Sequence, residues 1–342
     1  MSTAYVYDPL YLEHNQRGHV ECRERLEMTM QVLRETGLLE RLVQVQATPV
    51  PMEHLLEVHL PQYVDQVRAV SARGGGHLDP DTYTNNRSFE VALVAAGGLL
   101  SLLQAVLEGR VDNGFALVRP PGHHAVPGRG MGFCIFNNVA VAATYALKHK
   151  GLSRILIVDF DLHHGNSTHE VFYDTSKVLY FSTHQYPYYP GTGHWDSIGR
   201  GEGEGFTVNV PLPPGVGDEG YERVFDEILY PLAERYVPEL ILVSAGYDAH
   251  WADPLGMMQL SGAGYAYLTR TLKEMAAELC DGRLVFTLEG GYELKALAHS
   301  IAGTLQTLLG DEETSDPLGP SPRPGVPVDD LIVHLKGVHR LV

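Results

Sequence analysis

Four short apolar runs in this chain of 342 residues each end in a cluster of polar side chains, and this pattern constrains the fold more than any other feature. The runs begin at Phe115, Ile155, Ile241 and Leu284, and most of their residues are Val, Ile, Leu or Phe. Continuous apolar runs of this length are typical of strands that are buried on both faces of a parallel sheet. The sequence therefore predicts an α/β fold, a single-domain, doubly wound, mostly parallel β-sheet with helices on both faces.

The segments between these runs carry apolar residues at three- and four-residue intervals, which predicts helices. The predicted helices span residues 20–39, 88–107, 138–148, 219–236, 262–279 and 296–309. No linker rich in Ser, Gly or charge interrupts the chain before Gly310, so we expect one domain over residues 1–310. Residues 311–342 form a proline-rich tail, whose last apolar stretch is expected to pack on the same domain.

Composition excludes several classes of protein. A net charge of -17 and a pI of about 5.4 argue against direct nucleic-acid binding and suit a cationic substrate. Three cysteines without a Cys-x-x-Cys pair exclude a structural zinc finger. The N-terminus lacks a basic region followed by an apolar run, and we expect no apolar segment to approach the roughly 18 residues of a membrane span. These features predict a cytoplasmic protein.

The second apolar run ends in Asp161-Leu162-His163, which offers two metal ligands two residues apart. Side chains with this spacing at the end of a strand point to the same side. Asp248 follows the third run, and the carboxyl ends of parallel strands meet at one edge of a sheet. Carboxylate and imidazole ligands suit zinc, iron or cobalt, and a set of three leaves open positions, as in catalytic sites.

Eight short strings in the chain, in this order and spacing, resemble the zinc-dependent histone deacetylase superfamily, which includes bacterial acetylpolyamine amidohydrolases. The strings are RPPGHHA, GFCIFNN, VDFDLHHGN, YPGTG, NVPLPPG, SAGYDAH, DPLG and LEGGY. The resemblance runs from about Tyr7 to about Leu309 and implies the arginase/deacetylase fold. It is nearer to the class II branch and its bacterial members, because Asn166 stands where class I members tend to have Asp.

The resemblance also implies a role for each polar group at the strand ends. Asp161, His163 and Asp248 would hold one catalytic zinc ion. His123 and His124 would be tandem catalytic histidines, with His124 as the general base and later acid, and Tyr292 would polarise the substrate carbonyl. A catalytic histidine needs an acceptor that fixes its tautomer. The family pattern gives this role to Asp159 behind His123 and to Asn166 behind His124.

Further positions follow from the same resemblance. The family carries one or two structural potassium ions, largely on backbone carbonyls, and Arg25 matches an arginine of its internal exit channel. The substrate tunnel would have Phe133 and Tyr189 as walls, Gly132 at a point of close approach, and Leu255 and Asp81 at the rim. The first potassium ion would lie among Asp159, Asp161, His163, Ser182 and Thr183, and the second among Phe172, Thr175, Val178 and Phe206.

Amide hydrolysis needs an activated water molecule, a donor to the developing oxyanion and a proton for the leaving amine. The resemblance names a candidate for each, so we predict a zinc-dependent hydrolase that removes acetyl or other acyl groups from acylated amines. Acetyl-lysine is the favoured substrate, because polyamine-specific members of this branch place an acid where Leu255 stands. Acetylpolyamine, a two-metal arginase-type reaction and a non-catalytic acyl-lysine-binding module are the alternatives. A homo-oligomer is also left open, since dimerisation over the site can give bacterial members polyamine selectivity.

Overall fold

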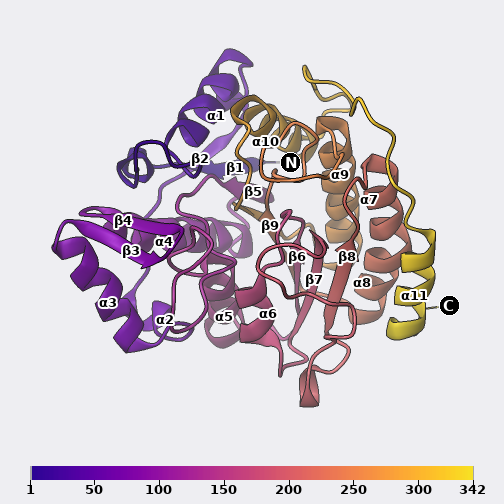
Figure 1. Cartoon of the computed structure of the whole chain (residues 1–342), viewed down its shortest axis with the longest axis horizontal. Coiled ribbons are helices and arrows are strands. Elements are labelled where there is room, and N and C mark those ends of the chain that lie inside the picture. The colour runs from indigo at the N-terminus through magenta and orange to yellow at the C-terminus, as the bar shows by residue number, and fades with distance from the viewer. Residues whose placement is uncertain (1, 342) are drawn as a thin grey trace.

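The computed structural model describes residues 2–341, and its centre is an eight-stranded sheet in the order β2-β1-β5-β10-β9-β6-β7-β8 (Figure 1). All neighbouring strands are parallel, which confirms the predicted α/β fold. Three of the four predicted runs form β10, β9 and β6, whereas the first run, which begins at Phe115, supplies only the last two residues of β5. These four strands lie side by side in the middle of the sheet. The strands span Thr3–Val6 (β1), Val43–Val45 (β2), Asn113–Ala116 (β5), Ile155–Asp159 (β6), Val178–Gln185 (β7), Thr207–Leu212 (β8), Leu240–Ala245 (β9) and Leu284–Leu288 (β10).

Helices cover both faces of the sheet, as predicted (Figure 1). One layer contains α4 (Ser88–Leu107), α5 (Asn138–His149) and α6 (Asn166–Phe172). The other layer contains α1 (Glu24–Glu35), α7 (Asp218–Val224), α8 (Tyr230–Tyr236), α9 (Gly262–Leu279) and α10 (Leu294–Leu309). A π-helical segment, η4 (Phe225–Leu229), joins α7 to α8, so residues 218–236 form the continuous helical stretch that the periodicity predicted.

The helix predicted over residues 20–39 begins later and ends earlier than expected. It starts at Glu24 because the preceding segment places the Glu21 side chain in a buried ion pair with Arg119. It ends at Glu35, and Gly37 then adopts a φ of 68°, a left-handed conformation that stops a helix. Apolar periodicity alone missed both boundaries.

Smaller elements surround the two layers. Strands β3 (Gly75–Asp79) and β4 (Thr82–Asn85) form an antiparallel hairpin next to α3 (Pro61–Ala72). Near the C-terminus, α11 packs against η4 and buries Ile332 and Leu335. The remaining short helices are η1 (Pro9–Glu13), η2 (Leu39–Arg41), α2 (Met52–Leu55) and η3 (Gly201–Gly203), and α11 itself spans Asp329–His339.

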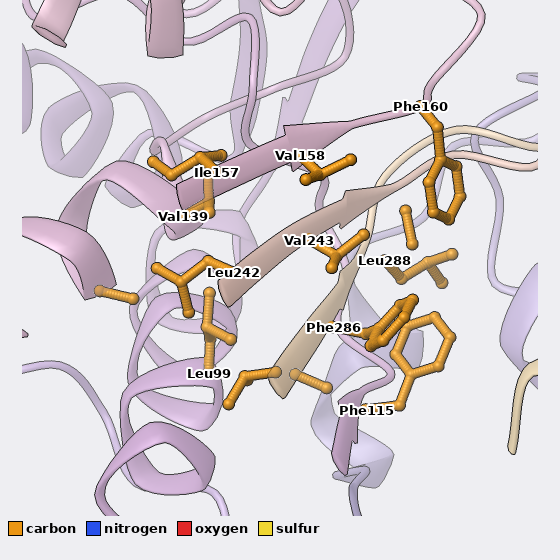
Figure 2. Close-up of a cluster of buried hydrophobic side chains, with 14 of the residues drawn as sticks. Leu99, Phe115, Val139, Ile157, Val158, Phe160, Leu242, Val243, Phe286 and Leu288 are labelled. Atoms are coloured by element: carbon orange, nitrogen blue, oxygen red, sulfur yellow. The ribbon is translucent and has the colours of Figure 1, made fainter. Parts of the chain in front are cut away.

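The core is continuous from the sheet into the helices. Figure 2 shows Leu99 of α4 and Val139 of α5 beside the side chains of β6 and β9. The strand register aligns Val158, Val243 and Phe286 across three adjacent strands, and all three are fully buried. Burial of large apolar side chains contributes about 1.5–3 kcal/mol each, so the central strands are firmly fixed. Their carboxyl ends therefore form a rigid platform.

Helix α4 contradicts the expectation that no segment is long and apolar enough for a membrane span. It has 20 residues and an 18-residue window of mean hydropathy 1.9, so by length and composition alone it could cross a membrane. In the structure 72% of that window is buried inside the protein. Gly97 allows this close packing, because a Cβ there would lie 2.6 Å from the carbonyl carbon of Pro49. A buried core helix meets the same criteria as a spanning one, which is why composition did not distinguish them.

Candidate active site

The three predicted metal ligands converge at the carboxyl edge of the central strands. Asp161 and His163 follow β6, and Asp248 follows β9. His163 Nδ1 lies 3.2 Å from Asp161 Oδ1 and 3.1 Å from Asp248 Oδ2. Both carboxylates are buried, and the His163 side chain is 12% exposed. Three ligand atoms from two strand ends therefore meet at one point that substrate can reach.

Backbone amides orient both carboxylates toward this point. The second oxygen of Asp161, Oδ2, accepts a hydrogen bond from the Gly290 N–H at 2.8 Å. The second oxygen of Asp248, Oδ1, accepts one from the Leu162 N–H at 2.9 Å. Each carboxylate thus has one oxygen fixed by a distant backbone amide and turns the other toward the site, where Asp161 Oδ1 also accepts a hydrogen bond from the His163 N–H at 2.8 Å. A Cβ at residue 290 would lie 2.6 Å from Asp161 Oδ2, so the close approach requires glycine.

This ligand set fits a divalent ion of the zinc type. Zinc prefers nitrogen and oxygen ligands at about 2.0–2.1 Å in a tetrahedron, which places neighbouring ligand atoms about 3.3 Å apart. The two measured separations, 3.1 and 3.2 Å, agree with that spacing. Two buried carboxylates next to an imidazole also carry excess negative charge, which a cation would balance. With three protein ligands, positions are left for water and substrate.

The tandem histidines lie beside the ligands, and each has the acceptor that the resemblance implied. His123 Nδ1 lies 3.1 Å from Asp159 Oδ2, and His124 Nδ1 lies 2.7 Å from Asn166 Oδ1. Burial lowers the pKa of His124, and the charges of His123 and His163 lower it further. Burial also acts to lower the pKa of His123, but the negative charges of Asp159 and Asp161 raise it to about 10. The two histidines therefore differ in charge, and His124 is the neutral one.

Tyr292 follows β10 and lines the same cavity. Its ring packs edge-on against Phe133, with 5.7 Å between ring centroids, and the Arg25 guanidinium lies 5.1 Å from its centroid. Arg25 is fully buried and donates to the carbonyl oxygens of Gly291 and Glu289. The structure thus places Arg25 directly behind Tyr292, while its assignment to an exit channel stays a prediction.

Two acids that hold the site were not predicted from the sequence. Asp253 Oδ2 accepts hydrogen bonds from the N–H groups of Tyr292 and Glu293, and burial together with Asp248 raises its pKa to about 7. Glu289 accepts from the N–H of Gly122 at 2.7 Å and of His123 at 3.2 Å, and burial raises its pKa to about 7. Both occur inside the strings DPLG and LEGGY, which mark them as part of the family pattern but do not show which groups they bind.

A narrow cavity of about 90 Å³ leads to these groups. All five predicted substrate-binding residues line it, together with the two histidines, His163 and Tyr292. The turn at its wall is unusual, because Phe133 has a φ of 66° and a Cβ at residue 132 would lie 2.8 Å from His124 Cγ. Backbone strain of this kind is concentrated at functional sites. The predicted lining residues are Asp81, Gly132, Phe133, Tyr189 and Leu255.

Some residues of each implied potassium site are neighbours in the structure, although both assignments stay predictions. For the first site, the register pairs Asp159 of β6 with Ser182 of β7, which brings both backbones beside the residues that follow β6. Thr183 Oγ1 is buried without a hydrogen-bond partner among the described residues. For the second site, the carbonyl oxygen of Phe172 accepts from the N–H of Thr175 at 3.3 Å, and that of Phe206 accepts from the N–H of Tyr180 at 2.9 Å. Val178 is the first residue of β7 and lies between Thr175 and Tyr180 in the sequence.

Other chemically capable groups do not join the site. Cys134 lines the cavity, but burial raises the pKa of its thiol well above the usual range, so it is a packing residue and a poor nucleophile. A larger hollow of about 830 Å³ lies beyond the amino ends of β6 and β7, where Arg154 and Lys177 line it. It contains none of the predicted zinc ligands, neither of the tandem histidines and not Tyr292. An open three-ligand set beside a proton-transfer pair is typical of metal-dependent hydrolases.

Comparison of the sequence and the structure with known proteins identifies the family to which this chain belongs. Residues 19–308 match the histone deacetylase domain. A probable deacetylase of Archaeoglobus fulgidus is 46% identical over 314 residues, which cover 91% of this chain and 87% of that protein. The human protein named polyamine deacetylase HDAC10 is 43% identical over 94% of this chain, which spans 50% of the length of HDAC10. The crystal structure of the HDA15 HD domain superposes with a TM-score of 0.91 at 36% identity, over 99% of this chain and 95% of that one.

The chain therefore belongs to the histone deacetylase family. The predicted resemblance and the arginase/deacetylase fold are confirmed. Family membership supports deacetylase activity, which is a hydrolase reaction, and decides against the arginase-type alternative.

Proposed function

We propose that this protein is a zinc-dependent amidohydrolase that removes acetyl groups from acetylated amines, with acetyl-lysine as its preferred substrate class. The observation that carries the proposal is the convergence of a three-ligand set, two histidine–acceptor pairs and Tyr292 on one narrow cavity. Amide hydrolysis uses each of these groups, and a purely binding module would need none of the proton-transfer pairs.

Asp161, His163 and Asp248 would hold the zinc ion. When bound, zinc lowers the pKa of a water molecule and polarises the substrate carbonyl. The backbone bonds from Gly290 and Leu162 hold the two carboxylates ready for it. The ligand positions therefore need little rearrangement.

The proton transfers are assigned to His124. Asn166 Oδ1 can only accept a hydrogen bond, so the proton of neutral His124 lies on Nδ1 and its Nε2 is left as a base. That nitrogen would take a proton from the attacking water and return it to the departing amine nitrogen. Burial lowers the pKa of His124 and so keeps its ring neutral, with an unprotonated Nε2. The Tyr292 hydroxyl would donate to the developing oxyanion.

The cavity supports a substrate with a slender, unbranched chain. Phe133 and Tyr189 give it aromatic walls, and Leu255 contributes no charge at the rim. A neutral side chain at this position neither attracts a distant ammonium group nor repels a peptide backbone. This favours acetyl-lysine within a peptide.

Acetylpolyamine is the second candidate, and two observations favour it. Asp81 lines the cavity, so its mouth carries one acidic side chain that suits a polyamine cation, although burial and then the neighbouring Asp79 raise the pKa of this carboxyl. In addition, a relative with 43% identity is named a polyamine deacetylase. The two candidates share one catalytic centre and differ only in what the rim binds.

The test is a side-by-side measurement of kcat/KM for an acetyl-lysine peptide, acetylspermidine and acetylputrescine with the zinc-loaded chain. We expect hydrolysis of all three, with the highest kcat/KM for the peptide. A preference for a polyamine of more than about tenfold would overturn the substrate assignment. Asp248→Ala is the inactive control, because it should lose both turnover and its tightly bound ion. If the folded, zinc-loaded protein hydrolyses none of these compounds, the proposed activity is wrong.

A further inference from the structure

A second group of metal-ligating side chains lies outside the active site, where α2 meets the end of α5. It consists of His54 in α2, Glu57 just after α2, and His149, the last residue of α5. One ligand atom from each residue lies within 4.8 Å of the others. His149 Nε2 is 3.0 and 3.2 Å from the two oxygens of Glu57, and His54 Nδ1 is 3.9 Å from Glu57 Oε2. Two imidazoles and one carboxylate therefore converge.

Packing around Tyr145 holds the two imidazoles in place. The Tyr145 ring lies edge-on to His54 at 4.8 Å and tilted to His149 at 5.4 Å between centroids. Its hydroxyl accepts a hydrogen bond from Gln104 Nε2 in α4 at 2.8 Å, which anchors it to the body of the protein. Tyr145 and His149 are four residues apart in α5, so they share one face of the helix. The cluster is supported by a fixed group and not only by mobile surface side chains.

His54 offers a nitrogen atom that the described residues leave without a partner. His54 Nδ1 is buried and has no hydrogen-bond partner among the described residues. An unsatisfied buried polar atom is costly, and a bound cation would relieve that cost. The side chains of His54, Glu57 and His149 are 15%, 21% and 39% exposed, so an ion can enter from solvent. The end of α5 also favours positive charge, because helix C-termini carry partial negative charge.

The donor set selects the kind of ion. Two imidazoles and a carboxylate suit zinc, cobalt, nickel or copper, whereas magnesium and calcium prefer oxygen ligands. We propose that His54, Glu57 and His149 form a second divalent-ion site, which takes zinc or a similar ion and links α2 to the end of α5. Lys148 Nζ lies 3.8 Å from Glu57 Oε1 and competes with the ion for this carboxylate. The proposal does not depend on the catalytic activity, because none of these residues lines the active-site cavity.

The test is a titration of the full chain, as purified with its tightly bound metal, with Co²⁺ and then Zn²⁺. Binding is followed by calorimetry and by the visible absorption of cobalt. We expect one further ion per chain in the wild type. In His54→Ala and His149→Ala the affinity for this ion should fall by at least about 100-fold, the upper range seen when even an indirect support of a metal ligand is lost. Lys148→Gln should bind it more tightly, because Glu57 loses its competing cation.

Three controls distinguish this site from the active site and from isolated surface histidines. His77→Ala removes an exposed histidine outside the cluster and should leave the second ion unchanged. Asp248→Ala removes an active-site ligand and should also leave it unchanged. Deacetylase activity should be the same in His54→Ala, His149→Ala and the wild type. The proposal is overturned if the wild type binds no further ion, or if both histidine variants bind it with wild-type affinity.

Discussion

Gly290 gives the sharpest test of the site geometry, because alanine there adds a single methyl group against two metal ligands. The added Cβ would lie 2.6 Å from Asp161 Oδ2 and 2.7 Å from Asp248 Cγ, and closer still to Asp248 Oδ2. Ordinary contact begins at 3.4 Å, so the Asp161 carboxylate must move by about 0.8 Å and the Asp248 carboxylate by more. The Gly290 N–H also donates to Asp161 Oδ2, so the group that would be displaced is the one that this residue orients.

The expected magnitude follows from this displacement. A misplacement of about 1 Å in reacting groups can reduce rate about 10²-fold, and disturbing the support of a metal ligand costs about 10- to 100-fold in affinity. We therefore expect Gly290→Ala to lower kcat/KM about 100-fold and to weaken zinc binding at least tenfold. The free energy of unfolding should fall by only about 1–3 kcal/mol, the usual cost of one excess methyl group in a packed region.

The assays are kcat/KM in zinc-buffered solution, zinc affinity by competition with a chelator, and urea unfolding. Gly337→Ala in α11 is the matched control, because its Cβ would meet nothing within 4 Å. That variant should keep wild-type activity and zinc affinity. If Gly290→Ala also keeps both within threefold of the wild type, the two carboxylates do not lie where the structure places them, and the reasoning fails.

Three further substitutions test separate groups of the protein. Tyr292→Phe removes the proposed oxyanion donor, so kcat should fall by about 10²- to 10³-fold with a smaller change in KM; an unchanged kcat removes this residue from the mechanism. Leu255→Glu should shift the ratio of kcat/KM values toward acetylpolyamine by roughly tenfold, and an unchanged ratio means that this side chain does not face substrate. Glu21→Gln leaves the buried guanidinium groups of Arg25 and Arg119 without their counter-charge, so urea titration should show a loss of about 3–5 kcal/mol. Burial acts to raise the pKa of Glu21, but the charge of Arg119 outweighs burial and lowers this pKa from 4.5 to about 2. The wild type should therefore keep this stability above pH 4.5 and lose it as the pH falls toward 2, whereas the glutamine variant should lack that step.

The central part of the fold could be predicted from the sequence because its strands are buried on both faces. Such strands need apolar residues, and those of β6, β9 and β10 are visible as runs. Strand β5 begins with Asn113 and Gly114, so its run marks only the end of the strand. Strand β2 has only three residues, two of them exposed, and β3 contains two glycines, so neither carries a comparable signal. Edge and hairpin strands are stabilised by pairing with neighbours, which a single sequence does not display.

The same distinction applies to the site. Asp161 and His163 could be predicted as ligands, because their two-residue spacing at a strand end fixes their direction. Asp253 and Glu289 could not, because an acid that accepts bonds from backbone N–H groups looks, in sequence, like any other acid. Asp253 is 39 residues from its partner Tyr292, and Glu289 is 166 residues from its partner His123. Only the folded chain brings these donors and acceptors together.

The bonds at the strand ends explain why the catalytic groups depend on one another. Asp161, after β6, is held by the N–H of Gly290, after β10, while Asp248, after β9, is held by the N–H of Leu162, after β6. Glu289, at the end of β10, holds the backbone that follows β5. Each ligand carboxylate thus accepts a hydrogen bond from a strand end other than its own, and Asp161 accepts a further one from the His163 N–H that follows the same strand. A change at one strand end must therefore move groups on its neighbours, so effects of substitutions within this set should be strongly non-additive, unlike those of distant pairs.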